Sequence, residues 1–122
     1  ATVASQVEAA LGVVLAAGPL PDGLVIAYEP VWAIGTGKVA RGADAAAIAA
    51  TIRSTVAGLV SPAAAEALPI LYGGSVTSAS CAEFLAEPGI DGVLLGGASL
   101  KPDEMAGIVG RAAATARERG AA

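Results

Sequence analysis

The sequence predicts an α/β fold built from parallel strands. Three short apolar runs, at 24–28, 69–72 and 92–95, alternate with longer segments whose apolar residues recur at helical spacing. Gly or Pro follows each run within two residues, as is typical of a strand that ends in a turn. Alternation of this kind favours parallel strands joined by right-handed helical crossovers. We expect a single domain over residues 1–122, with one helix followed by three β/α units.

The first expected helix ends at the Pro- and Gly-rich segment 18–23. The run 24–28 is apolar throughout, which is typical of a strand covered on both faces. The next helix is expected to be capped by Asp44. The apolar stripes of these two helices are Val3, Val7, Ala10, Leu11 and Val14, and then Ala45, Ile48, Ala49, Ile52, Val56 and Leu59.

The run 69–72 leads through GGSVTS into a helix expected at 79–86. The third strand, 92–95, leads through a second Gly-Gly turn into the last helix, where Pro102 suits the first turn. The polar tail 117–120 is expected to fray. The apolar stripe of the last helix is Met105, Ile108, Val109, Ala112 and Ala116.

Composition excludes several classes of function. The chain is 55% hydrophobic and carries a net charge of −4, which argues against nucleic-acid or anionic-membrane binding but not against a small anionic ligand. No apolar run reaches the roughly 18 residues of a membrane helix, and residues 1–10 lack the basic flank of a signal peptide. A lone cysteine, Cys81, predicts a buried core residue and a reducing, cytoplasmic location. No His is present to serve as acid, base or metal ligand, and we expect no metal site.

The paired Gly-Gly turns predict an anion site. Gly allows close approach of the backbone to a ligand, and free N–H groups at the entrance to a helix bind anions. Turns at 73–74 and 96–97 on neighbouring strands suit one phosphate, with Ser75 as a further donor. The alternative is that these glycines only make tight turns between a strand and a helix. Because two matched turns follow neighbouring strands, we favour the interpretation as a ligand site.

Glu29 follows the first strand, at the edge where parallel α/β folds place functional residues. Pro30 holds Glu29 in extended geometry, which aims the carboxylate. The flexible Gly35 and Gly37 suit the far end of a moving loop, and the bulky Trp32 could hold such a loop closed. The alternative for Glu29 is a solvated loop acid, and the alternative for Trp32 is a packed aromatic residue. The segment 35–40 also matches nucleotide-binding patterns in part, but its strand context and spacing are wrong for them.

Three segments together resemble the triosephosphate isomerase family. AYEPVWAIGTGK (27–38) is similar to that family's catalytic-glutamate and lid segment, YGGSV (72–76) to its seventh-strand phosphate loop, and DGVLLGGASL (91–100) to its eighth-strand phosphate loop. They occur in family order, and the resemblance is good over 24–110. It implies the C-terminal portion of a TIM (β/α)8 barrel, with 1–122 a partial-barrel domain made of helix five and then units six, seven and eight.

The resemblance implies interconversion of dihydroxyacetone phosphate and glyceraldehyde 3-phosphate through an enediol(ate), in glycolysis and gluconeogenesis. Glu29 resembles the general base, and a phosphorylated triose is the implied ligand, without a cofactor. The residues that resemble phosphate donors are Gly35, Ser75, Gly96 and Gly97. The residues that resemble the lid are Pro30, Val31, Trp32, Ala33, Ile34, Gly35, Thr36, Gly37 and Lys38.

The chain departs from the family by what it lacks. The family's first-strand Asn and Lys, fourth-strand His and following Glu have no counterpart here, and neither has the third loop that builds the parent family's homodimer. Three strands also leave two open sheet edges. We therefore expect the isolated chain to fold poorly or aggregate and to have negligible isomerase activity. Two alternatives remain: a non-catalytic sugar-phosphate-binding half-barrel, and a structural α/β module that leaves the Glu-Pro and Gly-Gly-Ser features unexplained.

Overall fold

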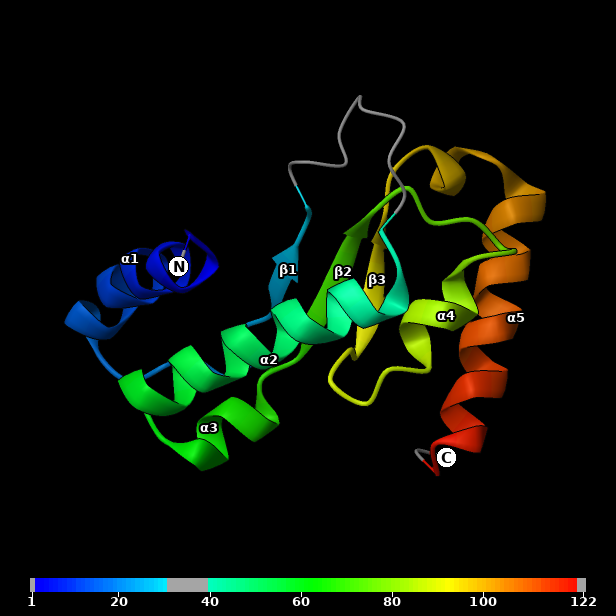
Figure 1. The fold of residues 1–122 in the computed structure, drawn as a ribbon. Helices are drawn as coiled ribbons and strands as arrows, with labels where there is room; N and C mark the ends of the chain where they lie inside the picture. The colour runs from blue at the N-terminus through cyan, green and yellow to red at the C-terminus, as the bar shows by residue number, and fades with distance from the viewer. Residues whose placement is uncertain (1, 31–39, 121–122) are drawn as a thin grey trace.

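The computed structural model describes residues 2–30 and 40–120, and these form a small sheet with helices on one side (Figure 1). The elements run in the order α1 (Thr2–Ala17), β1 (Ile26–Tyr28), α2 (Gly42–Leu59), α3 (Pro62–Ala67), β2 (Ile70–Gly74), α4 (Cys81–Leu85), β3 (Gly92–Leu95), η2 (Gly97–Leu100, a 3₁₀ helix) and α5 (Pro102–Glu118).

The predicted α/β class is confirmed, because the described strands form one parallel sheet in the order β1-β2-β3. Ile26 lies opposite Ile70 in the first pair of strands, and Leu71 lies opposite Gly92 in the second. In Figure 1, α2 lies in front of the sheet, α4 and α5 lie on the side of β3, and α1 lies beyond β1. The carboxyl ends of all three strands therefore lie at the same edge.

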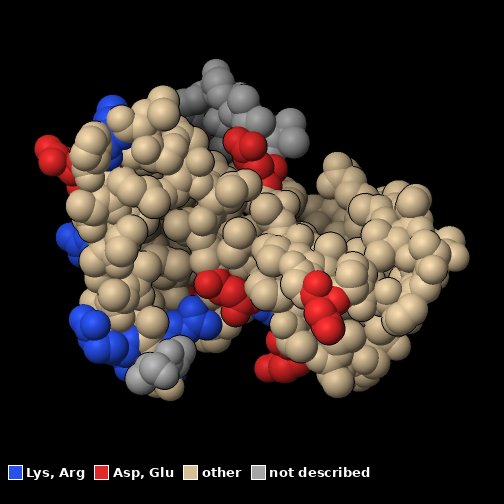
Figure 2. Space-filling view, turned by 180° about the vertical axis from the view of Figure 1, so that it is seen from behind, with Lys and Arg blue, Asp and Glu red and all other residues tan. Residues whose placement is uncertain are grey.

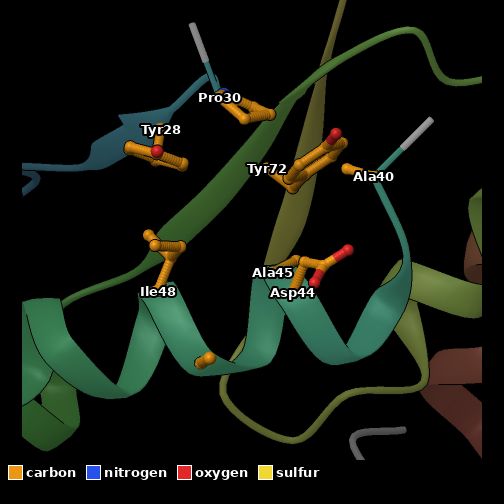
Figure 3. Close-up of a pocket in the computed structure, with 8 residues that line it drawn as sticks. Tyr28, Pro30, Ala40, Asp44, Ala45, Ile48 and Tyr72 are labelled. Atoms are coloured by element: carbon orange, nitrogen blue, oxygen red, sulfur yellow. The ribbon is translucent and has the colours of Figure 1, made fainter. Parts of the chain in front are cut away.

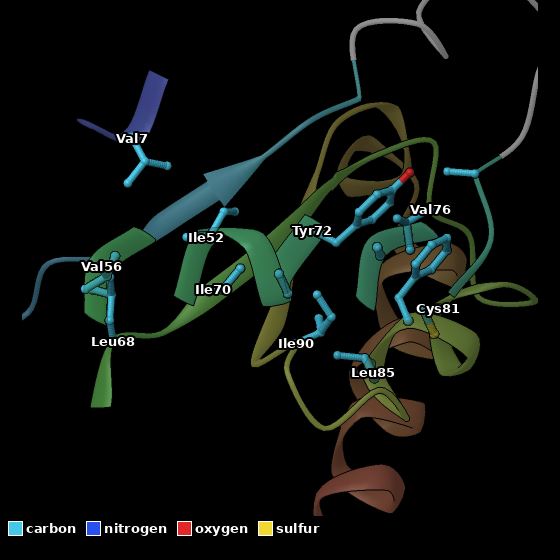
Figure 4. Packing of buried hydrophobic residues seen from close by; sticks show 14 of the residues in the cluster. Val7, Ile52, Val56, Leu68, Ile70, Tyr72, Val76, Cys81, Leu85 and Ile90 are labelled. Atoms are coloured by element: carbon cyan, nitrogen blue, oxygen red, sulfur yellow. The ribbon is translucent and has the colours of Figure 1, made fainter. Parts of the chain in front are cut away.

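The hydrophobic core lies between the sheet and α2. Ile70 and Tyr72 point from β2 toward the helices and are 1% and 4% exposed. Ile52 of α2 is buried in the same cluster (Figure 4). The ring of Phe84 in α4 stacks on Tyr72 with centroids 4.2 Å apart. Cys81 is fully buried in the same cluster, as predicted.

The opposite face of the sheet is uncovered in the described part of the chain, which corrects the expectation that the first strand is covered on both faces. Val25 and Leu94 are 45% and 55% exposed, and Ala27 is also exposed. Tan, uncharged surface predominates on this side, with Lys and Arg gathered along the α5 edge (Figure 2). Parallel sheets are otherwise buried on both faces, so this one presents a face that suits further packing.

Several bounds differ from the sequence expectation. β1 begins at Ile26 and not at 24, while β2 continues through both glycines to Gly74. The helix expected at 79–86 is the shorter Cys81–Leu85. Two elements were not expected, α3 and η2. In α3, Ser61 accepts a hydrogen bond from the N–H of Ala64 and Pro follows it, a combination that starts helices.

The predicted caps and stripes of the helices are correct only in part. Asp44 stabilises the start of α2 from its third position, where its carboxylate accepts the backbone N–H of Arg41 at 2.9 Å. In α5, Ile108 is buried as expected, but Met105 and Val109 are 39% and 55% exposed. Thr115 is buried instead, because α5 touches the core with a narrower face than its apolar pattern indicates.

Two arginines hold the edge of the sheet where the strands begin. Arg53 of α2 donates to the carbonyl oxygens of Ala65, Leu68 and Gly89, and to the carboxylate of Asp91. These bonds tie α2 to the segments that lead into β2 and β3.

Arg119 makes a similar anchor at the end of α5. It donates to the carbonyls of Leu85, Pro88 and Ile90, so the expectation that 117–120 frays is wrong for this residue. Across the described ranges, no helix combines the length and the apolar character that crossing a membrane requires.

Candidate active site

The carboxyl edge of the sheet brings four of the predicted residues to one side of the molecule. Glu29 follows β1, Ser75 follows β2, and Gly96 and Gly97 follow β3. All four are exposed. Strand pairing continues to the last residue of β2, where Gly74 lies opposite Leu95, so the second and third strand ends are neighbours.

Glu29 lies beside Gly73 of the neighbouring strand. A Cβ atom added to Gly73 would lie 3.7 Å from the Cβ of Glu29 and 3.9 Å from that of Leu94. These contacts place the three residues on the uncovered face of the sheet, because Gly73 pairs with Leu94 across β2 and β3. Any larger residue at 73 would add side-chain atoms to the space beside the Glu29 carboxylate.

Gly74 is required by the local backbone. Its φ is +156°, and a Cβ at this position would lie 2.8 Å from the hydroxyl oxygen of Tyr72. The chain therefore leaves β2 through a conformation that suits Gly. Ser75 comes next, and its hydroxyl makes no hydrogen bond to the described residues, which leaves it available to a ligand.

The turn after β3 is closed by a serine. The backbone N–H and the hydroxyl of Ser99 both donate to the carbonyl oxygen of Gly96, at 3.0 and 2.6 Å. Gly97 then begins η2, whose first N–H groups have no acceptor within the helix. The geometry offers polar donors beside Ser75 but no cationic side chain among the residues predicted for the phosphate.

Pro30, the one residue of the predicted lid that the structure describes, lies at a cavity on the helical side of the sheet, and so does Ala40, two residues after the end of that lid. Pro30 and Ala40 are both buried, and both line a space of about 200 Å³ between β1, β2 and α2 (Figure 3). Tyr28, Tyr72 and Asp44 also line it. The predicted lid residues Val31, Trp32, Ala33, Ile34, Gly35, Thr36, Gly37 and Lys38 lie outside the described residues, and so does the phosphate role predicted for Gly35.

Tyr72 remains a neutral phenol next to this cavity. Burial raises its pKa, and the negative charges of Glu29 and Asp44 raise it further. Tyr72 therefore keeps its proton near neutral pH and does not compete as a base.

Two glutamates that sequence reasoning did not single out support the site. The carboxylate of Glu83 in α4 accepts the N–H of Gly42 at 2.6 Å and the Nε of Arg41 at 2.9 Å. A Cβ on Gly42 would lie 2.7 Å from the Glu83 carbonyl oxygen, so α2 starts in close contact with α4. The Gly42 hydrogen bond, followed by the Arg41 side chain, holds the pKa of Glu83 below its ordinary value.

The second of these residues is Glu104, which binds Ser78 in the loop after β2. No sequence signal marks either glutamate, because their partners are 26 to 42 residues away. Residues 2–30 and 40–120 contain no cluster of three acids, cysteines or histidines with the geometry of a metal site. The end of β1 offers the exposed carboxylate of Glu29 and the ends of β2 and β3 offer neutral donors, which suits proton transfer beside a bound anion.

Comparison with known families gives a match over nearly the whole chain. A family model described as triosephosphate isomerase matches residues 1–112 of the 122.

Proposed function

Because the chain belongs to the triosephosphate isomerase family, we propose that it carries the base and the phosphate site for interconverting dihydroxyacetone phosphate and glyceraldehyde 3-phosphate. Its domain, 1–122, corresponds in this proposal to helix five and units six to eight of a TIM barrel. The observation that most supports it is the position of Glu29 beside Gly73, on the edge of the sheet from which Ser75 and Gly96 also emerge.

Glu29 is the proposed general base. Its carboxylate takes a proton from the carbon next to the substrate carbonyl, which leaves an enediolate. A proton then moves from one enediolate oxygen to the other, and the Glu29 carboxyl returns its proton to the adjacent carbon. Pro30 supports this role, since the residue before a proline is restricted to extended geometry. Gly73 supports it as well, since its missing side chain adds no atoms beside Glu29.

Ser75, Gly96 and Gly97 are the proposed phosphate ligands, through one hydroxyl and backbone N–H groups. Gly35 and the lid segment 30–38 are assigned by family motif alone. The proposal needs no cofactor or metal, because proton transfer and anion binding use only these groups.

The chain supplies no electrophile for the substrate carbonyl. Negative charge develops on that oxygen as the enediolate forms, and stabilising it is usually a large part of catalysis. The sequence contains no His, and the predicted site residues include no lysine other than Lys38. We therefore propose that the chain binds a phosphorylated triose but does not isomerise it appreciably alone, and that the family's homodimer does not form from it.

Binding is tested by titrating the chain with glycerol 3-phosphate and following backbone amide resonances. Shifts concentrated at 75 and 96–97 are expected. Ser75→Ala should weaken binding about tenfold, because a hydrogen bond to a charged phosphate is lost. The matched control is Ser54→Ala, an exposed serine of α2, which should bind like the wild type. Shifts elsewhere, or equal affinity in both variants, would remove Ser75 from the site.

Catalysis is tested by supplying the missing groups. The chain is mixed with the N-terminal portion of a family member that carries the Lys and His strands, and isomerisation is measured. Activity that appears on mixing and falls about a hundredfold in Glu29→Asp supports the base role, since the carboxylate is withdrawn by one methylene. Phosphate binding without any activity after mixing favours the alternative, a non-catalytic sugar-phosphate-binding half-barrel.

A further inference from the structure

Glu104 joins the two loops that carry the candidate phosphate ligands. It lies in the first turn of α5, which begins directly after the 97–100 turn that follows β3. Its two carboxylate oxygens accept the backbone N–H and the hydroxyl of Ser78, at 3.0 and 2.9 Å. Ser78 lies three residues after Ser75, in the loop that follows β2.

The same helix contacts this loop again one turn later. A Cβ on Gly107 would lie 2.8 Å from the Cβ of Ser78, so α5 approaches the loop as closely as a glycine allows. Within the loop, Thr77 and Ser80 exchange hydrogen bonds in which each hydroxyl accepts the backbone N–H of the other residue. The loop is therefore folded on itself, and its link to α5 runs through Ser78.

We propose that Glu104 is a positioning residue that fixes the loop bearing Ser75 at a set distance from the loop bearing Gly96 and Gly97. The inference rests on the proposed function, because it concerns the same phosphate site. One phosphate that accepts hydrogen bonds from both loops requires a constant separation between them. The carboxylate would repel a phosphate as a direct ligand, and here both of its oxygens already accept hydrogen bonds from Ser78.

The neighbourhood of Glu104 agrees with an ionised anchor. The two Ser78 hydrogen bonds are the main causes that hold its pKa below the ordinary value, and the positive charge of Lys101 adds to them. Asp103 precedes Glu104 in the same first turn but makes no hydrogen bond to the described residues. It therefore provides a matched control for charge and for position on the helix.

The experiment compares Glu104→Ala, Glu104→Gln and Asp103→Ala in the 122-residue chain, with inorganic phosphate as the probe. Glu104→Ala should weaken phosphate binding about fivefold or more, the usual lower range of coupling between sites. Glu104→Gln should restore most of the affinity, since its amide can accept the Ser78 N–H and donate to the hydroxyl oxygen. Asp103→Ala should bind like the wild type. Equal phosphate affinity in Glu104→Ala and Asp103→Ala would overturn the proposal.

A ligand-free measurement separates this inference from the proposed function. Without phosphate, Glu104→Ala should shift the amide resonance of Ser75 and speed hydrogen exchange at Ser78, and Asp103→Ala should do neither. An unchanged loop in Glu104→Ala would refute the anchor even where the wild type binds phosphate. A wild type that binds no phosphate would instead refute the proposed function, and with it the assignment of this anchor to a phosphate site.

Discussion

Replacing Arg53 with Met should destabilise the fold by several kilocalories per mole. Met has a similar length and apolar stem but no donor. The guanidinium makes hydrogen bonds to the carbonyls of Ala65, Leu68 and Gly89 and to Asp91. All of these bonds connect segments distant from Arg53 in the chain, so no neighbouring residue replaces them.

The magnitude follows from the partners. Three bonds end on carbonyl oxygens, and a net contribution of about 1 kcal/mol each gives about 3 kcal/mol. The side chains of Arg53 and Asp91 are 20% and 39% exposed, so solvent screening limits the ion pair to less than about 1 kcal/mol. Asp91 also keeps the N–H of Ile70 as a donor after the substitution. We therefore expect a loss of about 3 kcal/mol.

Urea unfolding followed by far-ultraviolet circular dichroism measures this loss, at a concentration where size-exclusion chromatography shows a monomer. With a slope near 1.5 kcal/mol per M, the midpoint should fall by about 2 M. Arg53→Lys keeps the charge but not the planar fork, so it should recover only part of the loss. Arg111→Met, an exposed arginine of α5, should change the free energy of unfolding by less than about 0.5 kcal/mol. Equal midpoints for Arg53→Met and Arg111→Met would refute the reasoning.

Three further predictions concern stability. Gly12→Ala in α1 should stabilise the chain by up to about 1 kcal/mol, because nothing lies near the added Cβ. Gly42→Ala should destabilise the chain by about 1–3 kcal/mol, because the added Cβ would contact the carbonyl oxygen of Glu83. Thermal melts of the pair test the sign, and a shared direction would contradict the contact. Ile52→Ala should lower the free energy of unfolding in urea by about 3–4 kcal/mol, and Ile52→Val by about 1 kcal/mol, because the side chain is 1% exposed. Similar losses in the two variants would contradict this and show that the neighbouring side chains close the cavity. The pKa of Glu83 is lower in the folded state, held there by Gly42 and Arg41, so its stabilisation is present above the unfolded pKa of about 4.3 and is lost as pH falls through the folded value. The urea midpoint should therefore fall less steeply as the pH is lowered for Glu83→Gln than for the wild type. Identical slopes would count against a stabilising role of the Glu83 carboxylate.

The sequence predicted the order and type of the helices and strands better than the residues at which they begin and end. Apolar periodicity located the main helices and all three strands, and the bounds of β3 agree at both ends. β2 was predicted too short because Gly73 and Gly74 are typical of turns, whereas pairing with β3 keeps both in the strand. The helix after Ser61 was missed although its Ser-Pro start is visible in the sequence. Arg119 was expected in a fraying tail because its three carbonyl partners are about 30 residues away.

The candidate site was predicted in the parts that local motifs encode. Strand-end position indicated Glu29, and the Gly-Gly turns indicated Ser75 and its neighbours. The anchors were not predicted, because Glu83 and Glu104 look like ordinary solvated acids until the fold brings α4 and α5 against distant backbone N–H groups. Their contribution depends on tertiary contacts, which neither composition nor spacing records.

The two edges of the sheet are held mainly by opposite kinds of charge. Where the strands begin, the guanidinium groups of Arg53 and Arg119 bind six carbonyl oxygens and one carboxylate, that of Asp91. Where the strands end, the carboxylates of Glu83 and Glu104 bind N–H groups. Guanidinium groups keep their charge at any pH used for proteins, whereas acid neutralises carboxylates. Acidification should therefore loosen the carboxyl edge of the sheet first and leave the opposite edge connected through the carbonyl bonds of its arginines, so the pH of the solvent sets the order in which the two edges open.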